Sequence, residues 1–389
     1  MLTQGWPFCG HRLFCVSGRV GHAMAVALCA LFLLVGCASR GAITIDPGAA
    51  ETGSTVEILV ATTRGASPTE TFATRVRSNT VRYGEVEVSV PPDRTPGTVT
   101  FPRGGRVNPA TDFLTVSARQ LADDQAFLNA LNARLALRKP GEREVTLFVH
   151  GFNTNFAEGL YRHAQMAHDF ASPAVSVSYS WPSAANVFAY GYDLESALFA
   201  RDGMERVLGL LARSNADGIV VVGHSMGTVV VLETLRQLSI RGSDSVLDRI
   251  RAVLLIAPDL DPQLFGQEVL AMAPREVPIY VTVSGRDRAL RASSLLRGQS
   301  ERLGSITDTS RVATLPGVVV VDISDIQGSG DPLNHFAVAT SPAMIAFISG
   351  LDRVGTTMLR DTERSSSVFE ATVEAAAGVA VVTLRPITQ

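Results

Sequence analysis

Short apolar runs, rich in β-branched residues, alternate along the second half of the chain with stretches of helical periodicity. The runs are Val145–Val149, Val175–Ser180, Ile219–Val222, Ala252–Ile256, Ile279–Val283 and Val318–Val321. Several of them are separated by helical stretches at residues 157–170, 193–213, 227–241 and 262–272. Strands that alternate with helices predict a mostly parallel sheet with helices on both faces, and therefore an α/β fold class.

The pattern before and after this region is less regular. Three strand-like runs come first, at Val56–Ala61, Gly84–Val90 and Phe113–Ser117. A stretch rich in Pro, Gly and Arg at 91–109 predicts a loop, and helical spacing over 119–137 predicts a helix. Another helix is expected near 341–350, and the tail 351–389 is first polar and then apolar. The sequence leaves open whether the last apolar run adds an edge strand.

The amino terminus has the features of an export signal. No Asp or Glu precedes Cys37, and the apolar run Ala23–Val35 follows Arg12 and Arg19. This run is short for a bilayer span but typical of a signal peptide. With Gly36 directly before Cys37, the segment resembles the bacterial lipobox, in which the cysteine receives lipid and becomes the first residue of the mature chain.

The lipobox resemblance implies a lipid anchor at Cys37 that binds the protein to a membrane of the bacterial cell envelope. Ala38 follows the cysteine, and by resemblance to Gram-negative lipoproteins this implies the outer membrane, facing the periplasm. An ordinary signal peptide with an incidental cysteine is the alternative. The expected organisation is a signal peptide (1–36), a tether (37–55), the α/β domain (56–350) and a C-terminal extension (351–389).

Composition and charge exclude several classes of protein. Of the 389 residues, 46% are hydrophobic, which is enough to bury a core and excludes a disordered or collagen-like chain. The 34 basic and 37 acidic side chains give a net charge of −3 without a basic run, so nucleic-acid binding is not expected. No His, Cys and carboxylate cluster has metal-ligand spacing, so we expect no metal and no other cofactor.

A serine in a G-x-S-x-G pentapeptide is the candidate nucleophile. Residues Gly223–Gly227 (Gly-His-Ser-Met-Gly) stand directly after an apolar run and directly before a predicted helix. A sharp turn from strand to helix exposes the hydroxyl of Ser225, and glycine at both ends of the motif admits close approach of neighbouring backbone. A serine hydroxyl becomes a good nucleophile when a base removes its proton.

The base and the acid are inferred from chain order. After a nucleophile of this type, the acid and then the histidine follow along the chain, and His335 is the only histidine after Ser225. Asp287 lies one strand before the His335 loop and is the preferred acid, with Asp259 and Asp261 as alternatives. A carboxylate in this position orients the imidazole and stabilises its positive charge.

Two backbone N–H groups are expected to bind the oxyanion of the reaction. The start of the helix after the nucleophile places the N–H group of Met226 near Ser225. The second donor comes from the loop after an earlier strand, where the sequence His150–Asn153 points to the N–H group of Phe152. His150 itself is expected to be structural, with its ring packed under this loop and hydrogen-bonded to backbone.

Together these residues resemble the alpha/beta-hydrolase superfamily and, more narrowly, a bacterial family of uncharacterised esterase/lipase superfamily hydrolases. The shared motifs are Phe148–Asn153 (FVHGFN), Tyr179–Ser183 (YSWPS), Gly223–Gly227 (GHSMG), Ala257–Asp261 (APDLD) and Asp287–Leu290 (DRAL). The resemblance implies the alpha/beta-hydrolase fold and supports Ser225, Asp287 and His335 as a catalytic triad. It supplies the chemistry without a substrate.

The expected function is cleavage of a small-molecule carboxylic ester through an acyl-enzyme intermediate. The alternatives are a peptidase, thioesterase or acyltransferase that uses the same triad, and a non-catalytic envelope lipoprotein that binds ligands. No insertion between strands is long enough for a large lid, which favours an open site and an esterase over an interface-activated lipase. The aromatic residues of 186–192 either line an acyl pocket or pack against the following helix.

Overall fold

The computed structural model describes residues 40–66, 73–272, 277–328, 331–345, 369–376 and 379–386. The chain divides into two units, Met1–Arg40 and Gly41–Gln389. The predicted signal peptide and Cys37 lie outside the described residues. Among the residues that are described, no helix combines the length and the apolar character needed to cross a membrane.

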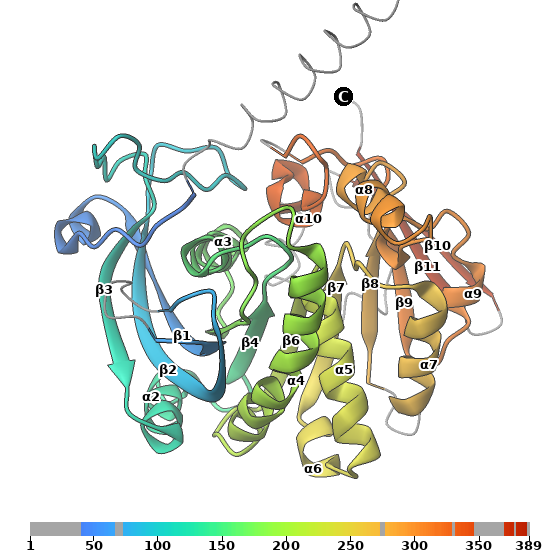
Figure 1. Cartoon of the computed structure of the whole chain (residues 1–389), viewed down its shortest axis with the longest axis horizontal. Coiled ribbons are helices and arrows are strands. Elements are labelled where there is room, and N and C mark those ends of the chain that lie inside the picture. Colours follow the sequence, from blue (N-terminus) through green and yellow to red (C-terminus); the bar gives the residue numbers. More distant parts are fainter. Residues whose placement is uncertain are drawn as a thin grey trace, which may run out of the picture. The chain divides into compact units, whose positions relative to one another are not determined.

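A mixed sheet of 11 strands, counted over the described residues, forms the centre of the second unit (Figure 1). The strands are β1 (Ser54–Arg64), β2 (Arg77–Val90), β3 (Leu114–Leu121), β4 (Glu144–Val149), β5 (Val175–Ser180), β6 (Gly218–His224), β7 (Ile250–Ile256), β8 (Ile279–Val283), β9 (Val318–Asp322), β10 (Phe369–Ala376) and β11 (Val379–Pro386). Their order in the sheet is β10-β11-β9-β8-β7-β6-β4-β5-β1-β2-β3.

The middle of the sheet is parallel and its margins are antiparallel. Strands from β11 across to β1 run in one direction, whereas β10, β2 and β3 are antiparallel to their neighbours. All six residues of β5 are buried, as expected for a strand covered on both faces. Parallel pairing brings the carboxyl ends of β4 to β9 to one edge of the sheet, named the carboxyl edge below, which faces upward in Figure 1.

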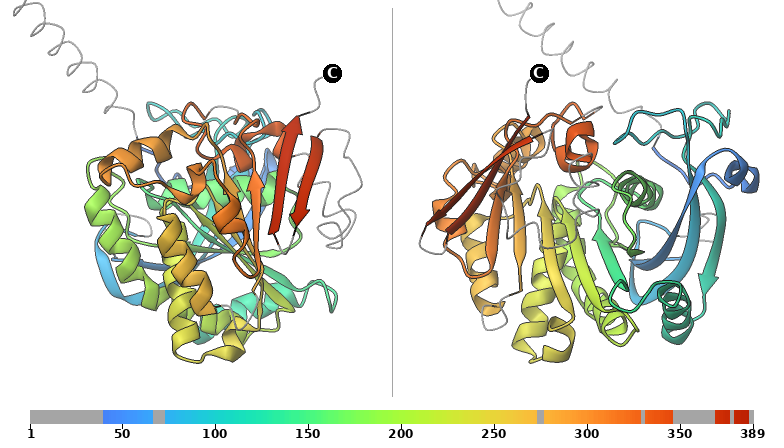
Figure 2. Two further views of the ribbon diagram at one scale, coloured as in Figure 1. Left: turned by 90° about the vertical axis from the view of Figure 1, so that its right-hand side faces the viewer. Right: turned by 180° about the vertical axis from the view of Figure 1, so that it is seen from behind.

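Helices cover both faces of the sheet. The helices are η1 (Pro47–Glu51), α2 (Asp124–Leu135), α3 (Phe156–Asp169), α4 (Tyr190–Ala212), α5 (Gly227–Ile240), α6 (Asp244–Leu247), α7 (Pro262–Met272), α8 (Arg288–Leu296), η3 (Leu303–Ser305), α9 (Ser310–Ala313) and α10 (Ala337–Thr340). Helices α2, α4, α5 and α7 share one apolar core with the sheet, and α3 and α10 contribute to the cores of the other face (Figure 2). The fold is therefore α/β, as the alternating pattern predicted.

One predicted helix begins later than expected. The helix expected over 119–137 begins at Asp124, because the residues up to Leu121 extend β3. There Leu121 pairs with Tyr83, and Arg119 pairs with Glu85, which also accepts a 2.7 Å ion pair from the Arg119 guanidinium. Cross-strand pairing therefore overrides the local helical spacing at this point.

The folded unit extends beyond both expected domain boundaries. Residues 41–55, expected to belong to a tether, include η1, in which Ala49 is fully buried and which the side chain of Asp46 caps. At the other end, β11 pairs in parallel with β9, and β10 is the antiparallel edge strand. The tail strands therefore extend the central sheet. Residues 342–345 are helical, and the remainder of the helix expected at 341–350 lies outside the described residues.

Candidate active site

Ser225 occupies a strained turn between β6 and α5. Its φ of 52° lies in the left-handed region, which residues other than glycine seldom adopt. The N–H group of Ser225 donates to Ile256 O at 2.9 Å, and Ser225 O accepts from the N–H group (3.1 Å) and hydroxyl (2.6 Å) of Thr228. These contacts hold the turn in a conformation that costs free energy and that occurs preferentially at functional sites.

Two glycines allow the loop after β4 to approach the Ser225 turn closely. A Cβ atom on Gly227 would lie 2.4 Å from His150 O. A Cβ atom on Gly151 would lie 2.8 Å from His224 Nδ1 and 2.9 Å from Ser225 Cβ. Since Cβ atoms do not approach other atoms this closely, a side chain at either position would push the loop and the turn apart.

The two predicted oxyanion donors have no partner in the described part of the chain. Neither the N–H group of Phe152 nor that of Met226 donates to any described acceptor. The Met226 residue is fully buried, and buried N–H groups without an acceptor are rare in folded proteins. Stabilisation of an oxyanion requires backbone N–H groups that are free to donate near the serine, and here one would come from the loop after β4 and one from the residue after Ser225.

The buried carboxylate of Asp193, in the first turn of α4, fixes residues 151–155, which carry the predicted Phe152 donor and are called the oxyanion loop below. It accepts hydrogen bonds from the N–H group of Asn153 (3.3 Å), the hydroxyl of Ser183 (2.5 Å) and the N–H group of Ala184 (2.6 Å). Burial raises the pKa of Asp193, against the opposing effect of these hydrogen bonds. The Ser183 hydroxyl in turn accepts from the N–H group of Thr154 at 3.2 Å.

Arg64 supports the same loop from the end of β1. Its side chain is 1% exposed, and its guanidinium donates to Ser180 Oγ (2.9 Å), Ser183 O (3.0 Å) and Thr154 O (2.8 Å). Neither Arg64 nor Asp193 stands in a motif of the sequence, because each is a single residue whose partners are remote along the chain. Both contact the loop that carries Phe152, the predicted oxyanion donor.

His150 is buried beneath the loop, as expected. Its ring stacks on Trp181 with centroids 5.1 Å apart, and its Nδ1 and Nε2 atoms lie 3.0 Å from Gly151 O and 3.1 Å from Trp181 O. Burial, together with the positive charge of Arg64, lowers the pKa of His150 to about 3. The ring is therefore neutral at physiological pH and has a structural role.

Asp287 and His335 form a hydrogen-bonded pair at the carboxyl edge. Asp287 caps α8 by accepting the N–H group of Leu290 at Oδ1 (2.9 Å), and its Oδ2 lies 2.7 Å from His335 Nδ1. Burial lowers the pKa of His335, but the hydrogen bond and charge of Asp287, with the charges of Asp259 and Asp331, raise it more. The net result is a pKa above the ordinary value for histidine.

The loop that carries His335 is held by contacts of the two residues that precede it. Asn334, at a φ of 51°, donates through its amide to Ile326 O (3.1 Å) and accepts from the N–H group of Gly328 (2.9 Å). The N–H group of Arg288 donates to Leu333 O at 2.9 Å, which ties the loop to the start of α8. The imidazole and its carboxylate partner are therefore positioned by one connected set of contacts.

The structure brings His335 beside the Ser225 turn without a hydrogen bond between the two side chains. The ring of His335 packs against that of His224, the residue before Ser225, with centroids 4.8 Å apart. Ser225 Oγ makes no hydrogen bond to any described residue, whereas its neighbours in the turn are firmly held. Hydrogen bonds between catalytic groups are often long in the absence of substrate and tighten when it binds.

The two alternative acids point elsewhere. Asp259 accepts the hydroxyl of Tyr190 at 2.7 Å and that of Ser293 at 2.6 Å, and Asp261 accepts the hydroxyl of Ser300 at 2.7 Å. Neither carboxylate is hydrogen-bonded to His335. Three aspartates, Asp287, Asp259 and Asp331, raise the pKa of this imidazole, and of these only Asp287 is hydrogen-bonded to it.

The aromatic residues before and in α4 lie in different surroundings. Tyr190 packs edge-on against Phe152, with ring centroids 5.2 Å apart, and so lies next to the oxyanion loop. Phe188 is 94% exposed. The 186–192 segment is therefore partly a wall of the site and partly open to solvent.

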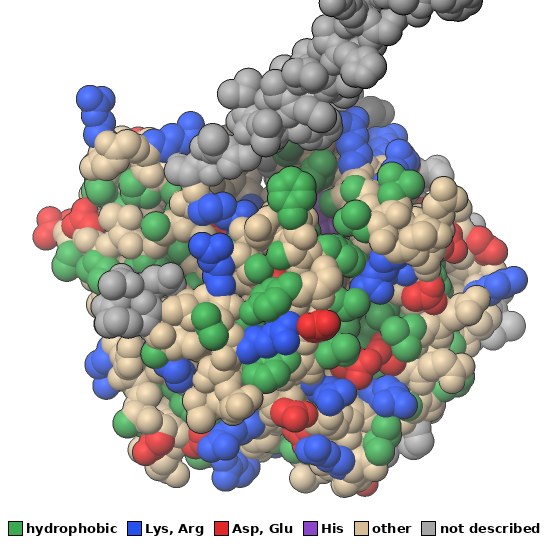
Figure 3. Space-filling view, in the orientation of Figure 1, with side chains coloured by type: hydrophobic (Ala, Val, Ile, Leu, Met, Phe, Trp, Pro, Cys, Tyr) green, Lys and Arg blue, Asp and Glu red, His purple; other side chains and the backbone are tan. Residues whose placement is uncertain are grey.

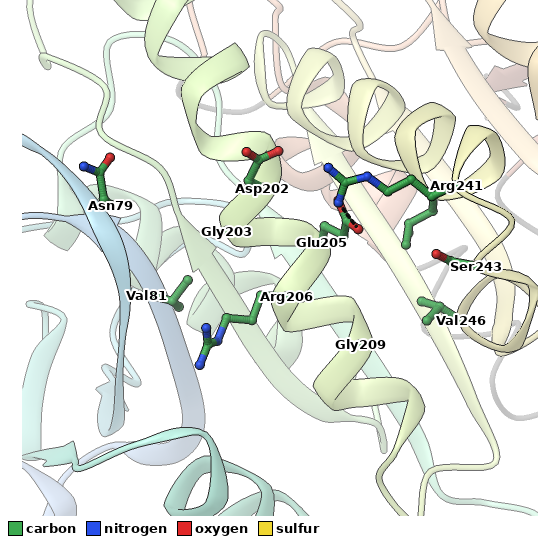
Figure 4. Close-up of a pocket in the computed structure, with 11 residues that line it drawn as sticks. Asn79, Val81, Asp202, Gly203, Glu205, Arg206, Gly209, Arg241, Ser243 and Val246 are labelled. Carbon is green, nitrogen blue, oxygen red and sulfur yellow. Dashed lines mark hydrogen bonds and ion pairs between the residues drawn. The ribbon is translucent and has the colours of Figure 1, made fainter.

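Cavity size does not locate this site. A small cavity of about 10 Å³ borders Asp287 and His335, which is room for about one water molecule. A cavity of about 470 Å³ lies between β2, α4 and α6 (Figure 4), where Arg241 is ion-paired with Glu205 at 2.7 Å. No histidine lines that larger cavity, so it offers no base for a serine.

The sequence is similar over residues 124–351 to the model of a family described as alpha/beta hydrolase of unknown function (DUF900). A fungal esterase from Rhizomucor miehei is a structural neighbour at 14% identity and a TM-score of 0.30, covering 77% of this chain and 85% of that one. A lipase-esterase related protein from Clostridium acetobutylicum gives 16% identity and a TM-score of 0.22, covering 52% of this chain and 81% of that one. No curated protein matches the sequence.

Proposed function

The chain belongs to a family of alpha/beta hydrolases of unknown function, and we propose that it is a serine hydrolase that cleaves carboxylic esters. The observation that carries this proposal is the 2.7 Å contact between His335 Nδ1 and Asp287 Oδ2, on a loop that packs beside the Ser225 turn. An imidazole whose Nδ1–H group donates to a carboxylate presents its Nε2 atom as a base.

The proposed reaction uses Ser225 as a covalent nucleophile. His335 Nε2 takes the proton of Ser225 Oγ as this oxygen attacks the ester carbonyl carbon, and the N–H groups of Phe152 and Met226 bind the resulting oxyanion. The C–O bond then breaks, and the alcohol leaves with the proton from His335. Water attacks the acyl-enzyme with His335 as the base, which releases the carboxylic acid and restores Ser225.

Asp287 acts through His335 in this scheme. Its carboxylate fixes the ring orientation and the tautomer and stabilises the positive charge that develops on the imidazole. Its position at the N-cap of α8, with 1% of the residue exposed, leaves it little freedom to move. A carboxylate that is already held in place stabilises the positive charge on the imidazole more than a mobile carboxylate of the same charge does.

Labelling with a fluorophosphonate probe tests the nucleophile. We expect a single adduct on Ser225 by mass spectrometry, together with turnover of p-nitrophenyl acetate, and loss of both in Ser225→Ala. Ser239→Ala, in which the altered hydroxyl donates to Ala271 O far from the turn, serves as the control and keeps both. Labelling that persists in Ser225→Ala would contradict the proposal. Parallel assays with thioester, peptide and acyl-acceptor substrates separate esterase activity from the other reactions of such a triad.

We also propose that the protein is anchored by lipid at Cys37 in the bacterial cell envelope, on the periplasmic side of the outer membrane. The support is the apolar run before Cys37 and the small residue next to it. Metabolic labelling with a fatty acid, followed by membrane fractionation, tests the anchor. We expect label and membrane association in the natural chain and neither in Cys37→Ser; equal labelling of both chains would refute the anchor.

A further inference from the structure

We propose that the carboxyl edge docks onto the surface of the bilayer that holds the Cys37 anchor, and that ester groups of membrane lipids are the substrates. This inference rests on the proposed function and adds to it the orientation of the site and the substrate class. It is carried by two separate observations. These are the place where the folded chain begins and the distribution of exposed apolar side chains.

The folded unit begins at the carboxyl edge. The N–H group of Gly41 donates to Glu158 Oε1 at 3.2 Å, and Gly41 O accepts from Asn155 Nδ2 at 2.7 Å. Asn155 and Glu158 form the capping box at the start of α3, and Asn155 is also the last residue of the oxyanion loop. The first residue of the unit is therefore fixed directly beside the loop that carries the Phe152 donor.

The anchor position is close to this point in sequence. Cys37 lies four residues before Gly41, and four extended residues span at most roughly 14 Å. A lipid on Cys37 consequently keeps Gly41, and the oxyanion loop with it, within that distance of the point where the lipid enters the membrane. If the folded unit began at the opposite edge of the sheet, the same short link to Cys37 would turn the candidate site away from the bilayer.

Exposed apolar side chains lie on several segments near the carboxyl edge. We call this set the apolar rim; its members, with their exposed fractions, are Val187 (55%), Phe188 (94%), Leu264 (44%), Leu295 (70%), Leu296 (66%) and Leu333 (49%). They lie before α4, at the start of α7, at the end of α8 and in the loop of the candidate base, all of which meet the carboxyl edge. Grouped exposed apolar side chains mark interaction surfaces.

Hydrogen bonds hold the segments of the apolar rim side by side. The Tyr190 hydroxyl lies 2.9 Å from Ser293 Oγ, which joins the start of α4 to α8. The contact from Arg288 N–H to Leu333 O joins α8 to the loop of the candidate base. These contacts place the start of α4, α8 and the loop of the candidate base next to one another, although they are distant in the sequence, and the Arg288–Leu333 contact also supports the loop of His335.

Basic side chains accompany the apolar rim. Arg288 and Arg291 are exposed on α8, and Arg286 precedes this helix, where it is ion-paired with Asp325 at 3.6 Å. In Figure 3, basic side chains lie at the upper edge of the molecule, and a histidine is visible in a recess between hydrophobic side chains below them. Apolar side chains flanked by arginines suit the interface of a bilayer with anionic headgroups.

The docked orientation defines the chemistry of the substrate. An ester group of a lipid in the facing leaflet enters the mouth of the site from the membrane surface. Hydrolysis consumes one water and yields one fatty acid and one alcohol, the lipid remnant, by the same acyl-enzyme route. The reaction needs no co-reactant other than water.

Vesicle binding tests the docking surface separately from catalysis. The chain beginning at Ala38, which lacks the acylated cysteine and retains the whole Gly41–Gln389 unit, is sedimented with vesicles of phosphatidylethanolamine and phosphatidylglycerol. We expect the triple variant Phe188→Ser, Leu295→Ser, Leu296→Ser to bind at least about tenfold more weakly, because it removes three apolar side chains from the interface.

A matched triple variant provides the control. Leu137→Ser, Ile240→Ser and Leu270→Ser alter side chains that are 79%, 64% and 53% exposed but lie near the ends of helices that point to the opposite edge. We expect this control to bind vesicles like the unaltered chain, and all three proteins to hydrolyse dissolved p-nitrophenyl acetate equally. Equal loss of binding in both triples, or no binding by the unaltered chain, would overturn the docking surface. Binding without any ester turnover would instead refute the proposed function.

Discussion

Two histidines near the carboxyl edge have opposite environments. His150, at the end of β4, is buried against Trp181 and Arg64, and its pKa is lowered to about 3. His335 is 17% exposed at its side chain, and contact with Asp287 raises its pKa above the ordinary value. Each ring has fixed hydrogen-bond partners, so order alone does not distinguish a base from a structural residue.

The difference lies in the charge of the partner and in access to the reacting atom. A cation beside a buried imidazole disfavours its protonated form, whereas a carboxylate stabilises that form. A general base must accept a proton and then hold it as a cation, which the surroundings of His335 allow and those of His150 oppose. The comparison therefore predicts that one ring contributes to rate and the other to stability.

The largest expected effect separates these two contributions. His335→Gln is expected to lower kcat/KM for a dissolved ester by about 10⁴-fold, because the proton of Ser225 then has no acceptor, with little change in the free energy of unfolding. His150→Gln is expected to lower the free energy of unfolding by about 2–4 kcal/mol, because it removes the single N–H donor of the buried neutral ring and the ring that stacks on Trp181. Ester kinetics and urea unfolding of both variants measure this, and a large rate loss from His150→Gln in folded protein would contradict it.

The second largest effect is expected at Asp287, the carboxylate partner of His335. Asp287→Asn is expected to lower kcat/KM by about 10³-fold, because the amide can donate to the imidazole and favour the wrong tautomer. Asparagine is as good an N-cap as aspartate, so α8 is expected to keep its stability. Asp259→Asn provides the control, since Asp259 is bonded to Tyr190 and Ser293 and not to His335. A greater rate loss in Asp259→Asn than in Asp287→Asn would assign the acid differently.

The core of the fold could be predicted because its strands are buried on both faces. Val175–Ser180 and Ile279–Val283 have the predicted bounds, since a covered parallel strand is a continuous apolar run with sharp ends. The end of β3 could not be predicted in this way. Its last residues include the exposed Arg119, so that the polar pattern resembles a helix until the pairing with β2 is known.

Prediction of the candidate site depended on motifs and on chain order. Ser225 stands in a recognisable pentapeptide, and His335 and Asp287 follow from the order of the three groups along the chain. Arg64 and Asp193 have no such signal, because their partners are remote: Arg64 donates to Ser183, which lies 119 residues away. Residues that position a loop through long-range contacts become visible only when the fold is known.

Arg64, which lies beside His150, tests whether the surroundings of His150 contribute to stability. Arg64→Met is expected to lower the free energy of unfolding by about 3 kcal/mol, because it leaves the carbonyl groups of the buried Ser183 and the partly buried Thr154 without this donor. Arg119→Met, in which the lost ion pair is 67% exposed on the arginine side, is expected to change it by less than about 1 kcal/mol. Urea unfolding measures both. Equal values for the two variants would show that the Arg64 contacts add no stability to the oxyanion loop.

The smallest expected effect is a shift in pH dependence. His335 must be neutral to act as a base, and its pKa is raised, so kcat/KM for a dissolved ester is expected to rise with pH through a midpoint above that of free histidine. Asp287→Asn removes the negative charge that raises this pKa, so the midpoint is expected to move to lower pH. His150→Gln is expected to leave the midpoint unchanged, because a group with a pKa of about 3 does not titrate in this range. Rates measured between about pH 5 and 9 give the midpoint for each variant, and a midpoint that moves with His150 but not with Asp287 would reverse the roles assigned to the two histidines.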